Sequence, residues 1–313
     1  MTATYIAPIR LSSREGVDEL AAYFATLRDV EVVIVDGSSP EVFAAVHSAV
    51  QSFATHVEPT VNGLNGKARG VLTGLSLATH DKIVVADDDV RYEPANLREV
   101  VRLLDLADVV RPQNFFSPAP WHAVFDSARS LINRAFDGDW PGTLAFRRSA
   151  LPNGYNPDVL FENFELVRTI CARGGTEIVA REIFVARRPA TLRHFLNQRV
   201  RQAYDEFARP VRFVAALAVL PILTAGWLAV GPLALGAFAA LSIFPALVGW
   251  SRGRAYRYFS FLAVLAAPLW VLERATCSWL ALYEYCRYGG VRYGDHILHR
   301  AASKANERAQ WAS

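Results

Sequence analysis

The chain has 313 residues, of which 52% are hydrophobic and 20% are charged, and its mean hydropathy is +0.16. This composition is too apolar for an ordinary soluble enzyme and too charged for a protein that lies wholly within a membrane, and it excludes a disordered chain and a collagen-like repeat. The three cysteines, at positions 171, 277 and 286, have no metal-type spacing, which argues against a structural zinc site and a disulfide scaffold. We therefore expect two chemically different parts in one chain.

Residues 1 to about 190 alternate short β-rich runs with helical patterns, which predicts an α/β domain with a mostly parallel sheet covered by helices. Strands are expected at 4–8, 31–35 and 82–86, and helices near 16–27, 40–52 and 67–78. In such sheets functional groups gather at the carboxyl ends of the strands. Three polar clusters follow the expected strands: Pro8-Ile9-Arg10, Asp36 to Ser39, and Asp87-Asp88-Asp89.

The acidic triplet Asp87-Asp88-Asp89 is the sharpest of these signals. Three consecutive carboxylates at a strand end repel one another unless a cation offsets their charge. Oxygen ligands of this kind suit Mg²⁺ or Mn²⁺, either of which can also bind a diphosphate. The alternative is a solvated acidic turn that merely ends the strand, and the Asp36-Gly37-Ser38 turn has the same ambiguity.

The segment from Asn65 to Gly70 reads NGKARG and places positive charge at an expected helix start. Its backbone N–H groups and the helix dipole could cradle an anion, although a solvated helix cap is the simpler interpretation. The spacings of a P-loop and of a Rossmann dinucleotide motif are both missing, which disfavours an ATPase or a dehydrogenase.

Residues 213–251 contain no charged residue, about twice the length that one membrane-spanning helix needs. The run divides at Gly231-Pro232, which predicts a tight transmembrane hairpin over residues 213–250. A buried helical pair of a soluble core is the alternative. Arginines flank both ends of the hairpin, so the positive-inside rule places both ends in the cytoplasm and predicts a multi-pass protein of the cell membrane.

The stretch 259–285 is apolar but interrupted, since Pro268, Glu273 and Arg274 lie within it. We expect it to lie in the membrane interface or to re-enter, with aromatic anchors at headgroup level: Trp270, Trp279, Tyr283 and Tyr285. Residues 213–313 carry nine basic against four acidic side chains, whereas residues 1–212 carry 24 against 26. The basic excess therefore flanks the membrane segment, and we expect no nucleic-acid partner.

Taken together and in order, seven segments between residues 6 and 202 resemble the family-2 glycosyltransferases, which have the GT-A fold and use nucleotide-sugar donors. The matching text is IAPIR, EVVIVDGSS, NGKARGVLTG, IVVADDDV, GTLAFRR, FENFEL and QRVRQ. The first 190 residues are thereby expected to form a cytoplasmic GT-A catalytic domain. No signal peptide is expected at Met1 to Ile9, because a basic region followed by an apolar core is lacking there.

The resemblance implies a role for each matching residue of the donor site. Three residues would line the nucleoside pocket: Pro8, Arg10 and Asp36. Two basic residues would lie beside the base or the diphosphate: Lys67 and Arg69. Asp87-Asp88-Asp89 would be the DxD motif, with Asp87 and Asp88 toward the nucleotide and Asp89, together with Asp87, holding Mg²⁺ or Mn²⁺.

The FENFEL segment falls where the family carries a Glu-Asp pair whose Asp is the general base. Asn163 stands in the place of that Asp, and an amide cannot accept a proton. The base is therefore Glu162 or Glu165, unless the acceptor is already ionised and needs none. A helix N-terminal turn that merely favours acidic residues is the alternative interpretation.

Gln198 and Arg201 match the QxxRW motif of membrane-bound members, with Gln202 in place of Trp. Arg201 could clamp the departing diphosphate with two hydrogen bonds, or it could simply contact lipid headgroups. The motif falls in residues 191–212, which we expect to form an amphipathic segment at the membrane surface. Residues 251–313 would follow the hairpin as the interfacial helix and a basic cytoplasmic tail.

The sequence thus predicts a membrane-anchored, inverting glycosyltransferase of the hexosyltransferase class that is dependent on Mg²⁺ or Mn²⁺. It would transfer a sugar from a nucleotide-diphosphate donor to a lipid or lipid-linked acceptor at the cytoplasmic face. A processive polysaccharide synthase is the first alternative, and a catalytically silent membrane scaffold with the same fold is the second. The sugar, the nucleotide, the acceptor and the oligomeric state are not readable from the sequence.

Overall fold

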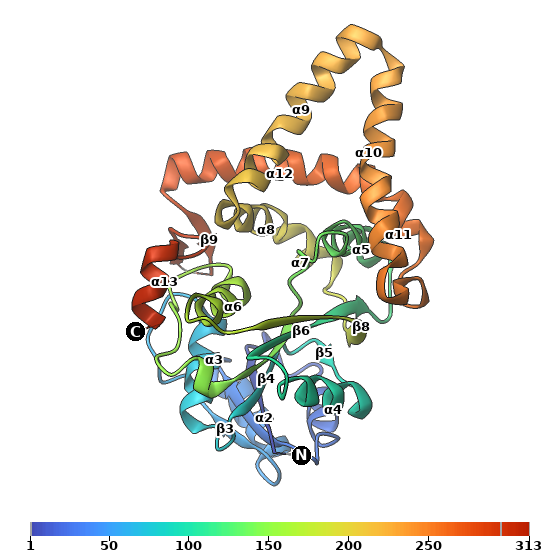
Figure 1. Ribbon diagram of the computed structural model, residues 1–313. Coiled ribbons are helices and arrows are strands. Elements are labelled where there is room, and N and C mark those ends of the chain that lie inside the picture. The colour runs from blue at the N-terminus through green and yellow to red at the C-terminus, as the bar shows by residue number, and fades with distance from the viewer. Residues whose placement is uncertain (1, 295, 313) are drawn as a thin grey trace. The chain divides into compact units, whose positions relative to one another are not determined.

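The computed structural model describes residues 2–294 and 296–312 (Figure 1). The chain forms two compact units, which are described separately. Unit 1 comprises Met1–Asn114, Trp140–Ala186 and Ser303–Ser313, and unit 2 comprises Phe115–Asp139 and Arg187–Ala302. The chain enters unit 2 at residue 187, close to the expected end of the α/β domain, and returns to unit 1 at residue 303. Residues 115–139 also belong to unit 2.

Unit 1 is built on an eight-stranded sheet of order β3-β2-β1-β4-β7-β6-β8-β5. Its strands are β1 (Thr4–Ile9), β2 (Glu31–Asp36), β3 (Thr55–Val57), β4 (Lys82–Ala86), β5 (Val90–Arg91), β6 (Val109–Phe116), β7 (Thr143–Arg147) and β8 (Glu177–Arg187). Its helices are α1 (Val17–Phe24), α2 (Pro40–Val50), α3 (Gly66–Leu77), α4 (Pro94–Leu103), α6 (Glu162–Ala172) and α13 (Ala305–Ala312).

The first four strands of that order run parallel, and β7 pairs antiparallel with both β4 and β6. The apolar runs at the centres of β1, β2 and β4 are buried, because helices cover the sheet on both faces. The mostly parallel α/β sheet predicted from the sequence is confirmed. Since β1, β2 and β4 are parallel neighbours, the polar residues that follow them meet at one edge of the sheet.

Helix α3 approaches β1 closely because two of its residues lack a side chain. A Cβ atom on Gly70 would lie 2.7 Å from Cβ of Pro8, and one on Gly74 would overlap the side chain of Ile6. Atoms of neighbouring side chains do not come that close in packed cores. The glycines of the NGKARGVLTG segment therefore fix the distance between the sheet and the start of α3, where Lys67 lies.

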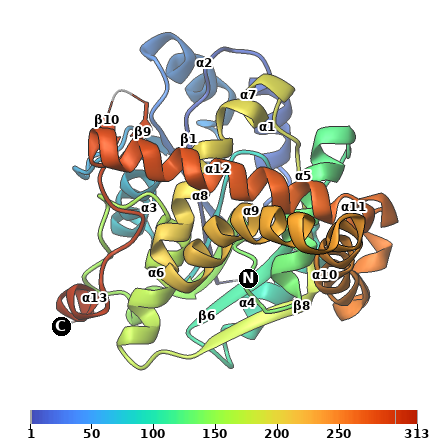
Figure 2. The ribbon, with the colours of Figure 1, turned by 90° about the horizontal axis from the view of Figure 1, so that it is seen from above.

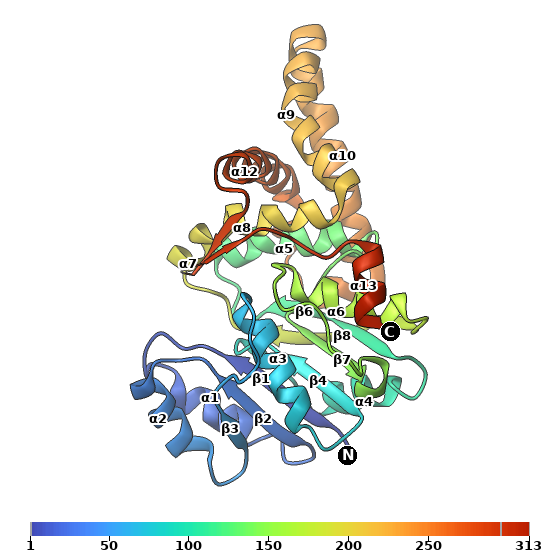
Figure 3. The ribbon, with the colours of Figure 1, turned by 90° about the vertical axis from the view of Figure 1, so that its left-hand side faces the viewer.

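Unit 2 is helical and carries two long apolar helices. Its elements are α5 (Trp121–Arg134), α7 (Leu192–Asn197), α8 (Arg199–Tyr204), α9 (Pro210–Val230), α10 (Pro232–Ser251), α11 (Phe261–Leu265), α12 (Ala267–Tyr288), and the strand pair β9 (Val291–Tyr293) and β10 (His296–Leu298). Helices α9 and α10 form a hairpin that turns at Gly231, whose φ of 59° suits a glycine (Figures 1 and 3). Among the described residues, two helices are long and apolar enough to cross a membrane, Pro210–Val230 and Pro232–Arg257.

Helix α12 extends across α8 and α9 of the same unit (Figure 2). Trp279 and Tyr283 are 44% and 61% exposed on it, which fits the expected interfacial helix. The expectation is wrong for Trp270, which is only 4% exposed and packs beside the buried Arg274. A residue that packs inside its unit cannot serve as an anchor among lipid headgroups.

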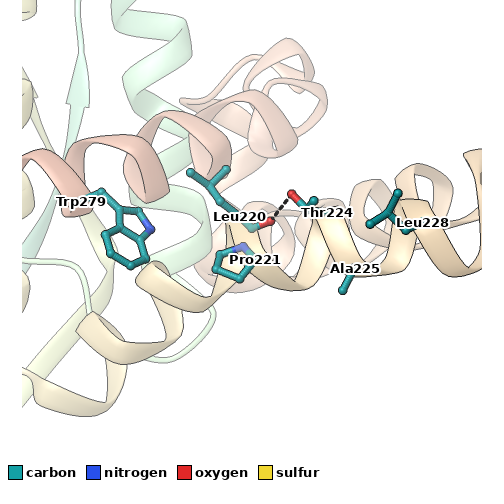
Figure 4. A pocket seen from close by; sticks show the side chains of 6 residues that line it. All are labelled: Leu220, Pro221, Thr224, Ala225, Leu228 and Trp279. Carbon is teal, nitrogen blue, oxygen red and sulfur yellow. Dashed lines mark hydrogen bonds between the residues drawn. The ribbon is translucent and has the colours of Figure 1, made fainter.

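A proline inside α9 explains how α12 is attached to the hairpin. Pro221 has no N–H, so the carbonyl of Leu217, four residues earlier, loses its helical donor. The indole Nε1 of Trp279 donates to that carbonyl at 3.1 Å. Beside this bond lies an apolar groove of about 570 Å³, lined by Leu220, Pro221, Thr224, Ala225, Leu228 and Trp279 (Figure 4).

We expect Trp279→Phe to lower the thermal midpoint of the protein in detergent micelles. The change keeps an aromatic ring but removes the N–H, which leaves the Leu217 carbonyl without a donor in apolar surroundings and costs about 1–2 kcal/mol. Trp227→Phe is the matched control, because Trp227 is exposed on the same helix α9. Equal shifts for the two variants would show that the hydrogen bond contributes nothing.

Candidate active site

The acidic triplet lies at the carboxyl edge of the sheet, directly after β4. The N–H of Asp87 donates to the carbonyl of Gly142 at 2.9 Å, and the N–H of Val90 donates back to the carbonyl of Asp87 at 3.1 Å. Asp87, Asp88 and Asp89 are all half-buried. Three carboxylates are therefore held in a fixed turn at the sheet edge, where their mutual repulsion favours a nearby cation.

Lys67 joins this turn to the start of α6. Its Nζ lies 2.5 Å from Oδ1 of Asp87 and 2.8 Å from Oε1 of Glu162. Burial opposes the charge of the ammonium group, but the two carboxylates outweigh it and raise the pKa of Lys67 above its ordinary value. Three residues that the sequence proposed for different roles, the metal site, the diphosphate contact and the base, thus form one cluster.

The position of Lys67 is set by Asn65, whose importance the sequence did not reveal. The buried Asn65 side chain accepts from the N–H groups of Lys67 and Ala68, at 3.0 and 3.3 Å. Its amide nitrogen donates to the carbonyls of Val159 and Leu160, just before α6. The expected backbone cradle for an anion is wrong for these two N–H groups, because Asn65 already occupies them. The positive charge at this point comes from the Lys67 side chain.

The two candidate bases on α6 have different surroundings. Glu162 faces Lys67 at the sheet edge. Glu165 is 0% exposed, and its Oε2 accepts from the backbone N–H of Ser303 at 2.9 Å. Between them, the side-chain amide of Asn163 donates to the carbonyl of Pro141 at 2.7 Å, a bond that an ionised Asp could not make. Asn163 therefore holds the loop that also receives the Asp87 N–H.

Asp36 ends β2 as expected, but its carboxylate is fully buried. It accepts from the Ser38 N–H at 2.8 Å and lies 3.2 Å from Nε2 of His56, whose other ring nitrogen is 3.2 Å from His47. Burial opposes its ionisation, but the bonds from His56 and Ser38 outweigh burial and lower the pKa of Asp36. The buried carboxylate of Asp36 thus stabilises the loop after β2 through its hydrogen bond with Ser38.

The remaining nucleotide-site candidates lie around the same strand ends. Pro8 is half-buried at the end of β1 against Gly70, and Arg10 is exposed two residues later. Nε of Arg69 donates to the carbonyl of Val61 at 2.9 Å, which ties its side chain to the loop before α3. Their contacts with a nucleotide stay a prediction.

The donor atoms of the triplet fit one class of metal ion. Among residues 2–294 and 296–312, no group of three or more His, Cys, Asp or Glu side chains is arranged to enclose a metal. Mg²⁺ and similar ions do not need such a cage, because they keep water and take oxygen ligands from one or two carboxylates and from substrate phosphates. Asp87 and Asp89 supply carboxylates of that kind.

Gln198 and Arg201 lie in unit 2, on either side of the start of α8. Gln198 contacts His194 and accepts from Gln202 at 3.4 Å, and the guanidinium of Arg201 lies 5.3 Å from the centre of the Tyr293 ring. The neighbouring Arg199 is buried instead, in ion pairs with Asp126 and Glu273 at 2.8 and 2.7 Å. The roles expected for Gln198 and Arg201 in diphosphate departure stay predictions.

Comparison with known proteins finds a family match for the part of the chain that contains Lys67 and the acidic triplet. A family model described as glycosyl transferase family 2 matches residues 14–146. No curated protein matches the chain. The mannosyltransferase PcManGT from Pyrobaculum calidifontis, solved with GDP-Man and Mn²⁺, is similar in structure, with a TM-score of 0.55 and 21% identity over 90% of this chain and 87% of that one. Glucosyl-3-phosphoglycerate synthase from Mycobacterium tuberculosis, solved with Mn²⁺, UDP and phosphoglyceric acid, has a TM-score of 0.44 and 18% identity over 62% and 72%.

Proposed function

We propose that this chain, which has the GT-A fold and matches glycosyl transferase family 2 over residues 14–146, transfers a sugar from a nucleotide-diphosphate donor to a lipid or lipid-linked acceptor. One observation carries the proposal. At the carboxyl edge of β4, Lys67 bridges Asp87 of the acidic triplet and Glu162 of α6 at 2.5 and 2.8 Å. The residues that we propose as diphosphate contact, metal ligand and base therefore share one small site.

On the donor side, Asp87 and Asp89 would hold Mg²⁺ or Mn²⁺ against the diphosphate, with Asp88 and Lys67 beside it. A bound cation of this kind stabilises the negative charge that grows on the leaving phosphate. Lys67 adds a second positive charge at that point, and its raised pKa keeps it protonated at neutral pH. The complex of PcManGT with GDP-Man and Mn²⁺ supports a donor and a cation of these classes.

On the acceptor side, Glu162 is the base that the geometry favours. Its carboxylate can accept the acceptor hydroxyl proton as the new glycosidic bond forms, and the ion pair with Lys67, at 2.8 Å, holds it at the sheet edge. Glu165 is a poorer candidate, because it is buried and accepts a hydrogen bond from the Ser303 N–H. The side chain of Asn163 is an amide and has no basic atom. Attack from the face opposite the leaving diphosphate would invert the configuration of the sugar, as the family resemblance implies.

The α9–α10 hairpin supports a hydrophobic acceptor. Its two helices lie in the two segments that are long and apolar enough to cross a membrane, and α9 has no buried residue. We propose that the hairpin anchors the enzyme in the cell membrane with both ends on the cytoplasmic side, where the flanking arginines lie. The enzyme and its lipid acceptor would then both diffuse in the plane of the membrane, which favours their encounter.

The test is a donor screen with the full-length protein in detergent and a lipid extract. We expect nucleotide release from one sugar donor, dependent on Mg²⁺ or Mn²⁺ and on the extract, and mass analysis should find one sugar added to a lipid. A long polymer made from donor alone would overturn single transfer in favour of a processive synthase. No release from any donor, with or without extract, would contradict transferase activity.

A further inference from the structure

The end of the chain returns to unit 1 and packs on α6. We call residues 303–312 the C-terminal strap; its helix α13 lies against α6 (Figures 1 and 3). The N–H of Ser303 donates to Oε2 of Glu165 at 2.9 Å, and its hydroxyl accepts from the side chain of Asn156 at 2.9 Å. Two different segments of unit 1 therefore hold the first residue of the strap.

Arg308, on α13 of the strap, contacts the same carboxylate of Glu165. Its Nε lies 3.4 Å from Oε2 of Glu165, and its Nη2 donates to the carbonyl of Ser303 at 2.5 Å. The guanidinium also lies 5.4 Å from the centre of the Phe164 ring on α6. One arginine thus contacts the helix, the buried acid and the start of the strap.

Glu165 depends on these contacts because it is 0% exposed. A buried carboxylate is strongly unfavourable unless hydrogen bonds or a paired cation compensate its charge. In the described part of the chain, its Oε2 receives that compensation from Ser303 and Arg308, while Oε1 has no hydrogen-bond donor. The strap therefore supplies the partners that allow an acidic residue at this point of α6.

Glu165 is one helical turn from Glu162, so it lies in the turn that presents Glu162 to Lys67. If the strap leaves, the uncompensated charge of Glu165 is expected to pull this turn toward solvent. A displacement of Glu162 by about 1 Å is enough to lower a rate of proton transfer about a hundredfold.

We propose that Glu165 and the C-terminal strap form a positioning clamp that holds Glu162 in place for the transfer step, an inference that rests on the proposed function. Glu165 acts through Glu162 and is a positioning residue. The strap is a required part of the active unit although it begins 138 residues after Glu165.

Removal of the strap tests the clamp. A chain that ends at Ala302 should lose kcat by about tenfold to a hundredfold, while Mn²⁺-dependent binding of the donor nucleotide changes by less than about twofold. Glu165→Gln in the same shortened chain should restore most of kcat, because a neutral amide needs no counter-charge. This rescue separates the clamp from a general loss of folding.

Point variants in the full-length chain provide the matched comparison. Arg308→Ala should lower kcat by about tenfold and Arg308→Lys by less, because lysine keeps the charge beside Glu165. Asn306→Ala, on the exposed side of α13, is the control and should leave kcat unchanged. A full kcat in the shortened chain, or an equal loss in Asn306→Ala and Arg308→Ala, would overturn the proposal.

Hydrogen exchange makes the clamp testable apart from the reaction. The amides at 162–166 should exchange at least tenfold faster in the chain that ends at 302, and Glu165→Gln should slow them again. If the wild type transfers no sugar but this pattern holds, the proposed function fails, while the ordering of residues 162–166 by the strap stands. If the wild type transfers sugar and the amides at 162–166 exchange at the same rate with and without the strap, the clamp fails and the proposed function stands.

Discussion

Asp89→Ala is expected to reduce nucleotide release by at least about a hundredfold and to remove the response to Mn²⁺. The carboxylate lies in the turn after β4, two residues from Asp87, which is already engaged with Lys67. Without Asp89 the site keeps one carboxylate of the proposed metal pair, and that carboxylate is shared with an ammonium group. A divalent ion bound to the diphosphate would then lack its second protein ligand.

Titration of Mn²⁺ against nucleotide binding and nucleotide release checks this expectation. Asp29→Ala is the control, because Asp29 is an exposed acidic residue of the same unit that lies outside the site. Its Oδ2 lies 3.9 Å from Nη1 of Arg98 at the surface. The proposed membrane anchoring should be the same in both variants and in the wild type. Nucleotide release by Asp89→Ala with an unchanged metal requirement would show that the required ion is held by other groups.

The sequence predicted the sheet edge well because strand ends are local features. Runs such as Ile83 to Ala86 are apolar, are bounded by polar residues and lie in an alternation of strands and helices, so the order of elements alone brings Asp36 and Asp87 to one edge. The meeting of Lys67 with Asp87 follows from the same topology. The charge-free run of the hairpin is equally local, and its two helices lie where they were expected.

The rest of the site depends on contacts between distant residues, which no local pattern contains. Glu165 looks like any acidic residue of a first helical turn until Ser303 and Arg308 fold back on it. The partner of Asp36 is His56, on the short strand β3, and Asn65 reads as an ordinary helix cap although it also binds the loop before α6. Packing decides these roles.

Helix α12 shows the same limit in the apolar part of the chain. Its sequence mixes aromatic, charged and small residues, so periodicity does not say which face is buried. Trp270 and Trp279 were expected to behave alike, yet one packs beside Arg274 and the other donates to the carbonyl that Pro221 leaves free. The difference lies in the partners of the two indoles, Arg274 of the same helix for Trp270 and Leu217 of α9 for Trp279.

Glu162→Gln is expected to lower kcat by about a hundredfold to ten-thousandfold while binding of the donor nucleotide persists. The amide keeps the shape of the side chain but cannot accept the proton of the acceptor hydroxyl. Glu165→Gln should lose far less activity, since its amide oxygen can still accept from the Ser303 N–H. Single-turnover transfer, measured with nucleotide binding on the same samples, separates a loss of chemistry from a loss of affinity.

The double variant Glu162→Gln with Asn163→Asp decides whether a carboxylate one residue later can replace this base. We expect no recovery, because Asn163 is buried and its amide donates to the Pro141 carbonyl, which an Asp carboxylate would repel. Recovery would return the base to the position that the family pattern gives it. Full activity of Glu162→Gln alone would mean that the acceptor arrives already ionised, as a lipid phosphate does, and that Glu162 serves only to hold Lys67.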